Sequence, residues 1–148
     1  MQANVTPAER TALVPWMTPA QMALFDAMHV ADQRHGLDVI GSLRAEDVAD
    51  LDVLCAGLLH DAGKGDTGVW PRVAYTLGSR YGRWIWRVVG IAPGFATALI
   101  RLRLHAETSA ALAHDAGCSP RTVGLIRYQD APRDPEFGEL LRLADEAN

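Results

Sequence analysis

An unbroken apolar run in the middle of the chain ends directly in a histidine and an aspartate. Every residue from Val53 to Leu59 is apolar, so a helix formed here has no polar face and should be buried on most sides. His60 and Asp61 follow at once, and burying such side chains without partners costs several kcal/mol. Successive helical residues point about 100° apart, so the two side chains converge on one ion only at a helix end or from slightly different coordination shells. The fold must therefore provide compensating groups there, and a metal ion is one such group.

Helical signals dominate the rest of the chain, and no alternating strand pattern competes with them. Thr18 followed by Pro19 predicts an N-cap and a first helical residue, and the apolar spacing extends this helix to Ala31. A second helix is expected over His35–Leu43, and Asp47 is expected to cap a third that contains the apolar run. Further helices are predicted over residues 69–77, 83–89, 95–116 and 136–147 and from Ser119-Pro120 onward. The sequence therefore predicts an all-α fold.

The chain is expected to form one domain, residues 18–148, preceded by an N-terminal arm, residues 1–17. The arm contains two prolines and little periodicity, which is typical of a loosely attached segment. A chain of 148 residues, 49% hydrophobic, has enough apolar material for a single core. Its start shows no secretory signal or membrane anchor, and its most apolar tract, residues 84–100, is interrupted too often to span a bilayer. We expect a cytoplasmic protein.

Charge and cysteine content restrict the classes of partner. A formal net charge of −4 and a pI near 5.7 argue against a surface devoted to a nucleic-acid backbone. Cys55 and Cys118 form neither a CxxC motif nor a disulfide framework, and Cys55 is expected to be a buried reduced thiol. The tract around Trp84 and Trp86 is a candidate homodimer face.

Four residues together form a pattern that resembles a known family. His35, the His60-Asp61 doublet and the distant Asp145 are similar to the histidine, His-Asp doublet and terminal aspartate of the HD superfamily of metal-dependent phosphohydrolases. The match runs from about residue 32 to residue 148. The resemblance implies a compact HD-domain bundle of about six to eight helices, in which these four residues bind a divalent ion. Mixed nitrogen and carboxylate ligands accommodate Mn²⁺, Fe²⁺, Co²⁺, Ni²⁺, Zn²⁺ or Mg²⁺.

Two further segments resemble small bacterial single-domain members of this superfamily. Gly63-Lys64 follows the doublet, and His105-Ala106-Glu107 opens a later helix. The resemblance implies catalytic roles for Asp61, Lys64 and His105. Lys64 would neutralise a phosphate, and His105 would orient water, donate a proton to the leaving group or join a second ion. Further candidates for phosphate contacts are Arg72, Arg101 and Arg127.

The chain departs from the family where dinuclear members have another histidine. Here it reads Arg127-Tyr128-Gln129-Asp130, and because glutamine is a poor metal ligand, a mononuclear site is favoured. The leading hypothesis is a phosphohydrolase that acts on a nucleotide or another small phosphate ester through a metal-bound water. The alternative is a catalytically weak or inactive HD-like metal-binding or regulatory module, which Tyr128-Gln129 supports best. A metal-dependent oxygenase is a third hypothesis.

Other polar residues have simpler interpretations. A second doublet, His114-Asp115, precedes the helix-ending Gly117 and is expected to be a solvated helix end. His29 lies outside the pattern and is expected to be a structural or surface residue. Lys64 also suits the C-terminal dipole of its helix without any catalytic role. For the first doublet, the alternative to a metal site is a hydrogen-bonded structural pair.

Overall fold

The computed structural model describes residues 4–64 and 104–148. Within these ranges the chain forms seven α-helices and one short 3₁₀ helix, and no strand, which confirms the all-α prediction. In chain order these are α1 (Pro7–Leu13), α2 (Pro19–Ala27), α3 (Val30–Ala45), α4 (Leu51–Leu59), η1 (Ala62–Lys64), α8 (His105–Asp115), α9 (Pro120–Arg127) and α10 (Gly138–Ala147).

Several predictions from the sequence fall between these ranges. The helices expected over residues 69–77 and 83–89, and the first part of the helix over 95–116, lie outside the described residues. Arg72, Arg101, Trp84 and Trp86 lie outside them as well, so the candidate dimer face stays a prediction. Of the helices in the described part of the chain, none combines the length and the apolar content that a membrane span requires.

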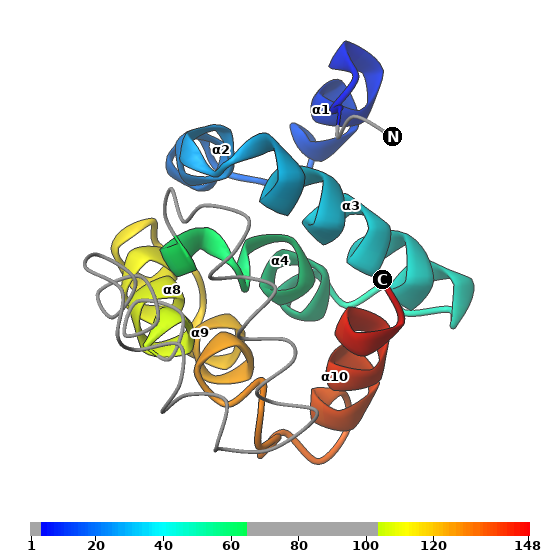
Figure 1. Cartoon of the computed structure of the whole chain (residues 1–148), viewed down its shortest axis with the longest axis vertical. Helices are drawn as coiled ribbons and strands as arrows, with labels where there is room; N and C mark the ends of the chain where they lie inside the picture. Colours follow the sequence, from blue (N-terminus) through cyan, green and yellow to red (C-terminus); the bar gives the residue numbers. More distant parts are fainter. Residues whose placement is uncertain (1–3, 65–103) are drawn as a thin grey trace, which may run out of the picture.

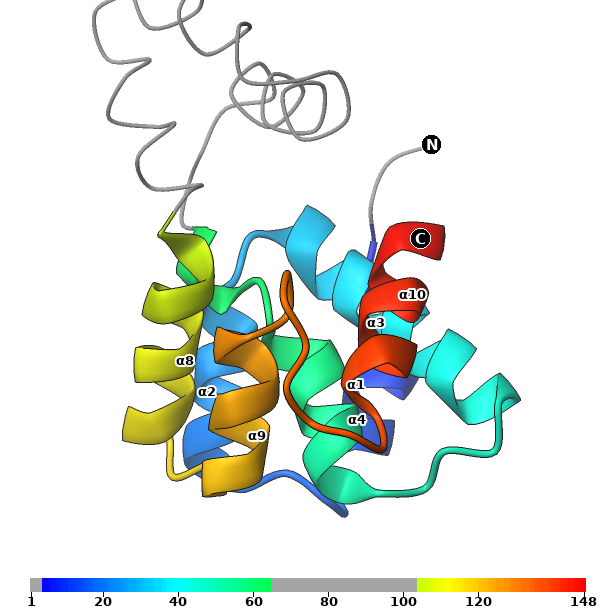
Figure 2. The same cartoon turned by 90° about the horizontal axis from the view of Figure 1, so that it is seen from below.

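Helix α4 occupies the centre of the bundle (Figure 1). It packs against α2, α3, α9 and α10, while α8 lies beside α9 and η1 on one side (Figure 2). All residues of the predicted apolar run, Val53–Leu59, are buried, including Cys55, which is only 6% exposed. The apolar run is therefore covered on all sides, and the C-terminal end of α4 delivers His60 and Asp61 into the interior.

The start of α4 differs from the prediction. Asp47 does not cap the helix; it has a positive φ of 60° in the turn after α3, a conformation that aspartate tolerates better than most residues. The N-cap is Asp50, whose Oδ1 accepts hydrogen bonds from the backbone N–H groups of Asp52 and Val53. Val48, buried at 5% exposure, anchors the intervening turn in the core, so the helix begins later than predicted.

The predicted first helix is divided in two. Helix α2 starts at Pro19 with a Thr18 capping box, as predicted, but it ends at Ala27 because Met28 is extended. His29 then becomes the N-cap of α3, with its Nδ1 accepting a hydrogen bond from the Ala31 N–H at 3.2 Å. His29 therefore has a structural role. His35 lies in the second turn of α3 and not in the first turn of a separate helix.

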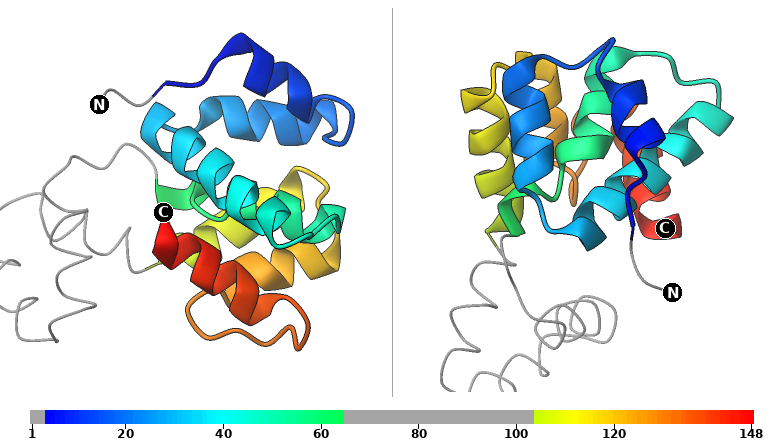
Figure 3. Two further views of the ribbon diagram at one scale, coloured as in Figure 1. Left: turned by 90° about the vertical axis from the view of Figure 1, so that its right-hand side faces the viewer. Right: turned by 90° about the horizontal axis from the view of Figure 1, so that it is seen from above.

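The N-terminal segment is more closely attached than its two prolines predict. Pro7 begins α1 behind a Thr6–Glu9 capping box, and Leu13 is 1% exposed within the hydrophobic core. Arg10 forms an ion pair with Asp26 of α2 at 2.5 Å. Figure 3 shows α1 on the outer side of α2 and α3. Pro7 thus acts as a first helical residue, where its missing N–H has no partner to lose.

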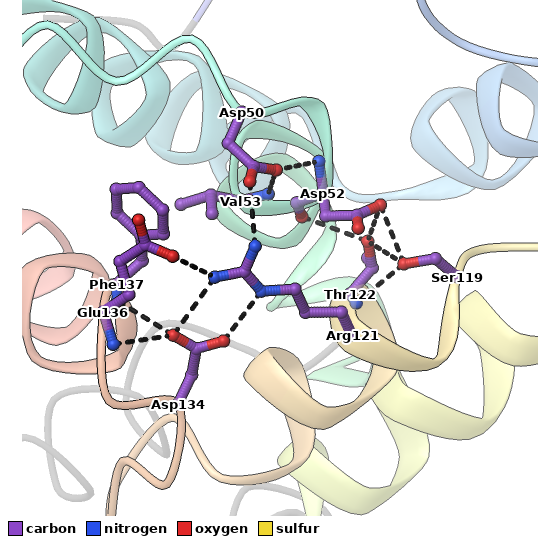
Figure 4. A network of polar contacts seen from close by, with 9 residues as sticks. All are labelled: Asp50, Asp52, Val53, Ser119, Arg121, Thr122, Asp134, Glu136 and Phe137. Carbon is purple, nitrogen blue, oxygen red and sulfur yellow. Dashed lines mark hydrogen bonds and ion pairs between the residues drawn. The ribbon is translucent and has the colours of Figure 1, made fainter.

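A polar network connects the start of α4 with the segment that leads into α10 (Figure 4). The Arg121 guanidinium on α9 donates to Asp50 at 2.9 Å, to Asp134 at 2.8 Å and to Glu136 at 3.0 Å. Its hydrogen bond lowers the pKa of Asp134 to about 2, so this carboxylate stays charged at neutral pH. The network fixes where α10 begins, and α10 in turn positions Asp145.

Close packing of α3 on α4 depends on Gly36, which predicts a sharp contrast between two glycines of α3. A Cβ at Gly36 would lie 2.6 Å from the Leu58 carbonyl oxygen, whereas a Cβ at Gly41 would meet nothing within 4 Å. Gly36→Ala should therefore destabilise the protein by about 1–3 kcal/mol. Gly41→Ala should stabilise it by about 0.5–1 kcal/mol through helix propensity. Urea denaturation checks both values, and equal effects of the two variants would contradict the packing described here.

Candidate metal centre

Three helices bring the site together at the buried end of α4. His35 comes from α3, His60 is the C-cap residue of α4 with Asp61 directly after it, and Asp145 comes from the last turns of α10. The close approach at Gly36, next to His35, places the His35 and His60 rings edge to face with their centroids 5.2 Å apart. The convergence therefore depends on the packing of α3 and α10 against α4.

One carboxylate oxygen lies between two imidazoles. Asp145 Oδ1 is 2.7 Å from His35 Nε2 and 3.1 Å from His60 Nε2. His35, His60 and Asp145 each offer a ligand atom, and these atoms all lie within 4.8 Å of one another. The His60 side chain is 2% exposed, but those of His35 and Asp145 are 23% and 37% exposed. The cluster is thus buried on the α4 side and open to solvent on the other.

The tautomer of His60 is fixed by the backbone of its own helix. Its Nδ1 lies 2.9 Å from the Gly57 carbonyl oxygen, and because a carbonyl only accepts, Nδ1 carries a proton. In the neutral ring Nε2 would then present a lone pair to Asp145 Oδ1 at 3.1 Å and Asp61 Oδ1 at 3.6 Å. Two carboxylates around a lone pair require a positive charge between them, either a proton or a metal ion.

The pKa shifts of His60 and Asp145 are consistent with a positive charge between the carboxylates. Burial lowers the pKa of His60, but the charge of Asp61 and the hydrogen bond and charge of Asp145 outweigh it and raise the pKa to about 9. Burial raises the pKa of Asp145, yet its hydrogen bonds to His35 and His60 bring it well below its usual range. Without a metal, the raised pKa favours a proton on His60 between the two carboxylates.

Asp61 contributes a buried carboxylate with one unsatisfied oxygen. Its side chain is 2% exposed, and Oδ2 accepts a hydrogen bond from Lys64 Nζ at 2.5 Å. Oδ1 has no hydrogen-bond partner among the described residues, although it lies 3.6 Å from His60 Nε2 and 3.9 Å from His105 Nε2. Burial raises the pKa of Asp61, and the charges of His60 and Lys64 more than reverse this. An orphaned anionic oxygen beside imidazole nitrogens fits a cation ligand.

A second glycine brings α8 to the site. The Gly63 N–H donates to Ser109 Oγ at 2.8 Å, and a Cβ at Gly63 would lie 2.5 Å from the Ser109 nitrogen and 2.7 Å from the His105 carbonyl oxygen. No other residue type permits η1 and α8 to approach this closely without a backbone shift. Gly63, inside η1, therefore helps to place His105 next to Asp61.

Gln129 is the site residue whose role the sequence did not predict. It is 6% exposed, and its amide Nε2 lies 3.0 Å from His105 Nε2, while its Oε1 has no partner among the described residues. The sequence pattern marked Gln129 as a replacement for a metal ligand. The structure gives it a contact instead, because the end of α9 packs on the start of α8.

The remaining candidates are placed as follows. Lys64, 22% exposed, contacts Asp61, and Arg127 pairs with Glu107 at 3.0 Å on the surface. The second doublet, His114-Asp115, has side chains 76% and 79% exposed, which confirms it as a solvated helix end. Three of the four predicted ligands, His35, His60 and Asp145, form one group. The fourth, Asp61, lies next to this group, with its Oδ1 3.6 Å from His60 Nε2.

Comparisons with protein-family models, with curated proteins and with solved structures find no match to this chain. Membership of the HD superfamily therefore stays a proposal, and the functional assignment depends on the geometry of the site.

A proton and the proposed metal ion would compete for His60 Nε2, which predicts a pH dependence of metal affinity. His60 must lose its Nε2 proton to bind a metal, and its pKa is about 9. Mn²⁺ affinity should therefore rise about tenfold per pH unit between about pH 6.5 and 8.

The metal-free protein should lose stability as pH rises from 6.5 through about 9, because a raised pKa stabilises the fold only while the proton is bound.

Titration calorimetry in buffers of different ionisation enthalpy measures both the affinity and the proton release. His114→Ala removes an exposed histidine and should leave the profile unchanged. An Mn²⁺ affinity that stays constant over this pH range would contradict the proposed protonation of His60.

Proposed function

We propose that this chain is an HD-type metal-dependent phosphohydrolase that acts on a nucleotide or another small phosphate ester. The observation that carries the proposal is the convergence of His35, His60 and Asp145 beside the orphaned oxygen of Asp61. Neither a purely structural salt bridge nor a hydrophobic core needs two histidines and two carboxylates at one buried helix end. A divalent cation would satisfy all four side chains at once.

The donor set fits a single divalent ion. His35 and His60 would supply nitrogen ligands, and Asp61 and Asp145 would supply oxygen ligands, a mixture that Mn²⁺, Fe²⁺, Co²⁺, Ni²⁺, Zn²⁺ and Mg²⁺ all accept. When bound, such an ion polarises a phosphoryl oxygen and lowers the pKa of a coordinated water. The exposed sides of His35 and Asp145 leave access from solvent for a small substrate.

Two further side chains have chemistry suited to phosphoester hydrolysis. Lys64 holds Asp61 Oδ2 and so keeps Oδ1 turned toward the histidines, while its ammonium charge favours an incoming phosphate. His105 Nε2 lies 3.9 Å from Asp61 Oδ1, close enough to orient a water or to protonate a leaving oxygen. Catalytic roles for Lys64 and His105 follow from the same proposal.

One observation favours the alternative function, a metal-binding or regulatory module with little or no turnover. His105 Nε2 is in contact with the buried amide of Gln129 at 3.0 Å. A ring nitrogen that is engaged in this way has less freedom to transfer protons. The metal-binding or regulatory module would use the same metal ligands as the enzyme, but His105 would have no catalytic role. The two functions therefore predict the same metal content and different turnover.

Metal content tests the part that both functions share. The purified protein, reconstituted with each divalent ion in turn, should retain about one equivalent, measured by elemental analysis. Asp61→Asn and Asp145→Asn should lose it, because each removes an anionic ligand. Asp115→Asn, in the exposed second doublet, is the matched control and should keep the ion. Absence of metal after reconstitution with Mn²⁺, Fe²⁺, Ni²⁺ and Zn²⁺ would overturn both functions.

Turnover separates the enzyme from the module. With the retained ion, the protein should hydrolyse at least one member of a panel of nucleotides and small phosphate esters. His105→Asn should keep the metal but lower kcat about 10²–10⁴-fold, as expected for loss of a proton-transfer group. Full metal occupancy without turnover across the panel would refute the phosphohydrolase and leave the module.

A further inference from the structure

The two cysteines of the chain, 63 positions apart in the sequence, lie in contact with each other. Cys55 belongs to the middle of α4, and Cys118 lies in the turn between α8 and α9. Their sulfurs are 3.7 Å apart, and the residues are only 6% and 8% exposed. They are the only cysteines in the sequence, so their meeting brings every thiol of the chain to one place.

Neighbouring hydrogen bonds hold the two backbones together independently of the sulfurs. Ser119 Oγ donates to Asp52 Oδ1 at 2.7 Å, and Thr122 Oγ1 donates to the Asp52 carbonyl oxygen at 3.1 Å (Figure 4). These bonds fix the start of α9 against the start of α4. To form a sulfur–sulfur bond of about 2.05 Å, the two sulfurs must close a distance of 3.7 Å at a junction that these hydrogen bonds already hold.

The two sulfurs have different surroundings. Gln21 Nε2 donates to Cys118 Sγ at 3.5 Å. Either thiol can donate to the other across their 3.7 Å contact, so Cys118, which also accepts from Gln21, has the additional donor that stabilises a thiolate. Hydrogen bonding from Cys55 lowers the pKa of Cys118, and the same contact together with burial raises the pKa of Cys55. The extra hydrogen bond from Gln21 thus makes Cys118 the favoured nucleophile and Cys55 the resolving thiol.

We propose that Cys55 and Cys118 form an oxidation site at which hydrogen peroxide joins α4 to the α8–α9 turn by a disulfide. The Cys118 thiolate attacks one peroxide oxygen, the O–O bond breaks, hydroxide leaves, and a sulfenic acid forms. The Cys55 sulfur then attacks the Cys118 sulfur, the S–O bond breaks, and water leaves with the Cys55 proton. Two thiols are oxidised, and one peroxide is reduced to two waters.

The site is independent of the proposed metal chemistry. Neither sulfur belongs to the His35, His60 and Asp145 group, and the disulfide requires no ion. Its consequence is mechanical, because it would close a long loop of the chain and connect the central helix to α8 and α9. A cross-link of this span should raise the melting midpoint by about 5–10 °C.

The test uses the reduced full-length protein treated with hydrogen peroxide. Both thiols should disappear together in a thiol assay on the denatured protein, and the intact mass should fall by two hydrogens. Peptide mapping should recover a Cys55–Cys118 cross-link, and the melting midpoint should rise and return on addition of dithiothreitol. A chelator in every sample removes metal-catalysed oxidation.

Two variants test the assigned roles. Cys55→Ser should stop at a Cys118 sulfenic acid that dimedone traps, whereas Cys118→Ser should leave Cys55 unreacted. The proposal is overturned if the wild-type protein forms intermolecular disulfides instead. It is overturned equally if Cys118 proceeds to sulfinic acid while Cys55 stays reduced, or if both thiols survive conditions that oxidise a free cysteine peptide.

Discussion

Burial of α4 is the constraint on which the rest of the structure depends. Its interior has no polar residue from Val53 to Leu59, so helices must cover it on every side, and its end delivers His60 and Asp61 where water cannot solvate them. The helices that surround this end of α4 must therefore supply polar side chains there. α3 supplies His35 and α10 supplies Asp145, and these partners satisfy charges that the apolar helix itself forces into the interior.

Two glycines let the helices approach closely enough for the side chains of the candidate site to meet. Gly36 lets α3 touch the backbone of α4 at Leu58, and Gly63 lets η1 touch the backbone of α8 at Ser109. A methyl group at either position would separate the elements by more than the hydrogen bonds at the site allow. The geometry of the side chains is thus set by backbone contacts one residue away from His35 and two residues away from Asp61.

Local signals in the sequence predicted the fold class and the starts of α2 and α9. Thr18-Pro19 and Ser119-Pro120 cap helices as expected. Thr6-Pro7 with Glu9 carries the same signal inside the segment that the sequence predicts to be a loosely attached arm. Asp47 and Asp50 are equally good caps by composition. Only the burial of Val48 decides between them, and that is a tertiary contact.

The candidate ligands were predictable as a set, since His35, His60, Asp61 and Asp145 fit one pattern. The contact of Gln129 with His105 was not, because it depends on how the end of α9 packs on α8. The meeting of Cys55 with Cys118 escaped prediction for a similar reason. Their spacing in the sequence carries no local signal, and only the packing of α4 against α9 brings them together.

The sharing of Asp145 Oδ1 by two histidines would link the proposed ion binding to folding itself. His35 and Asp145 are 110 positions apart, so an unfolded chain has no preformed group of ligands. An ion that binds only the folded chain stabilises it by mass action, by about 2.7 kcal/mol when its free concentration is a hundred times the dissociation constant. The supply of that ion would then set how much of the protein persists folded, in addition to any chemistry at the site.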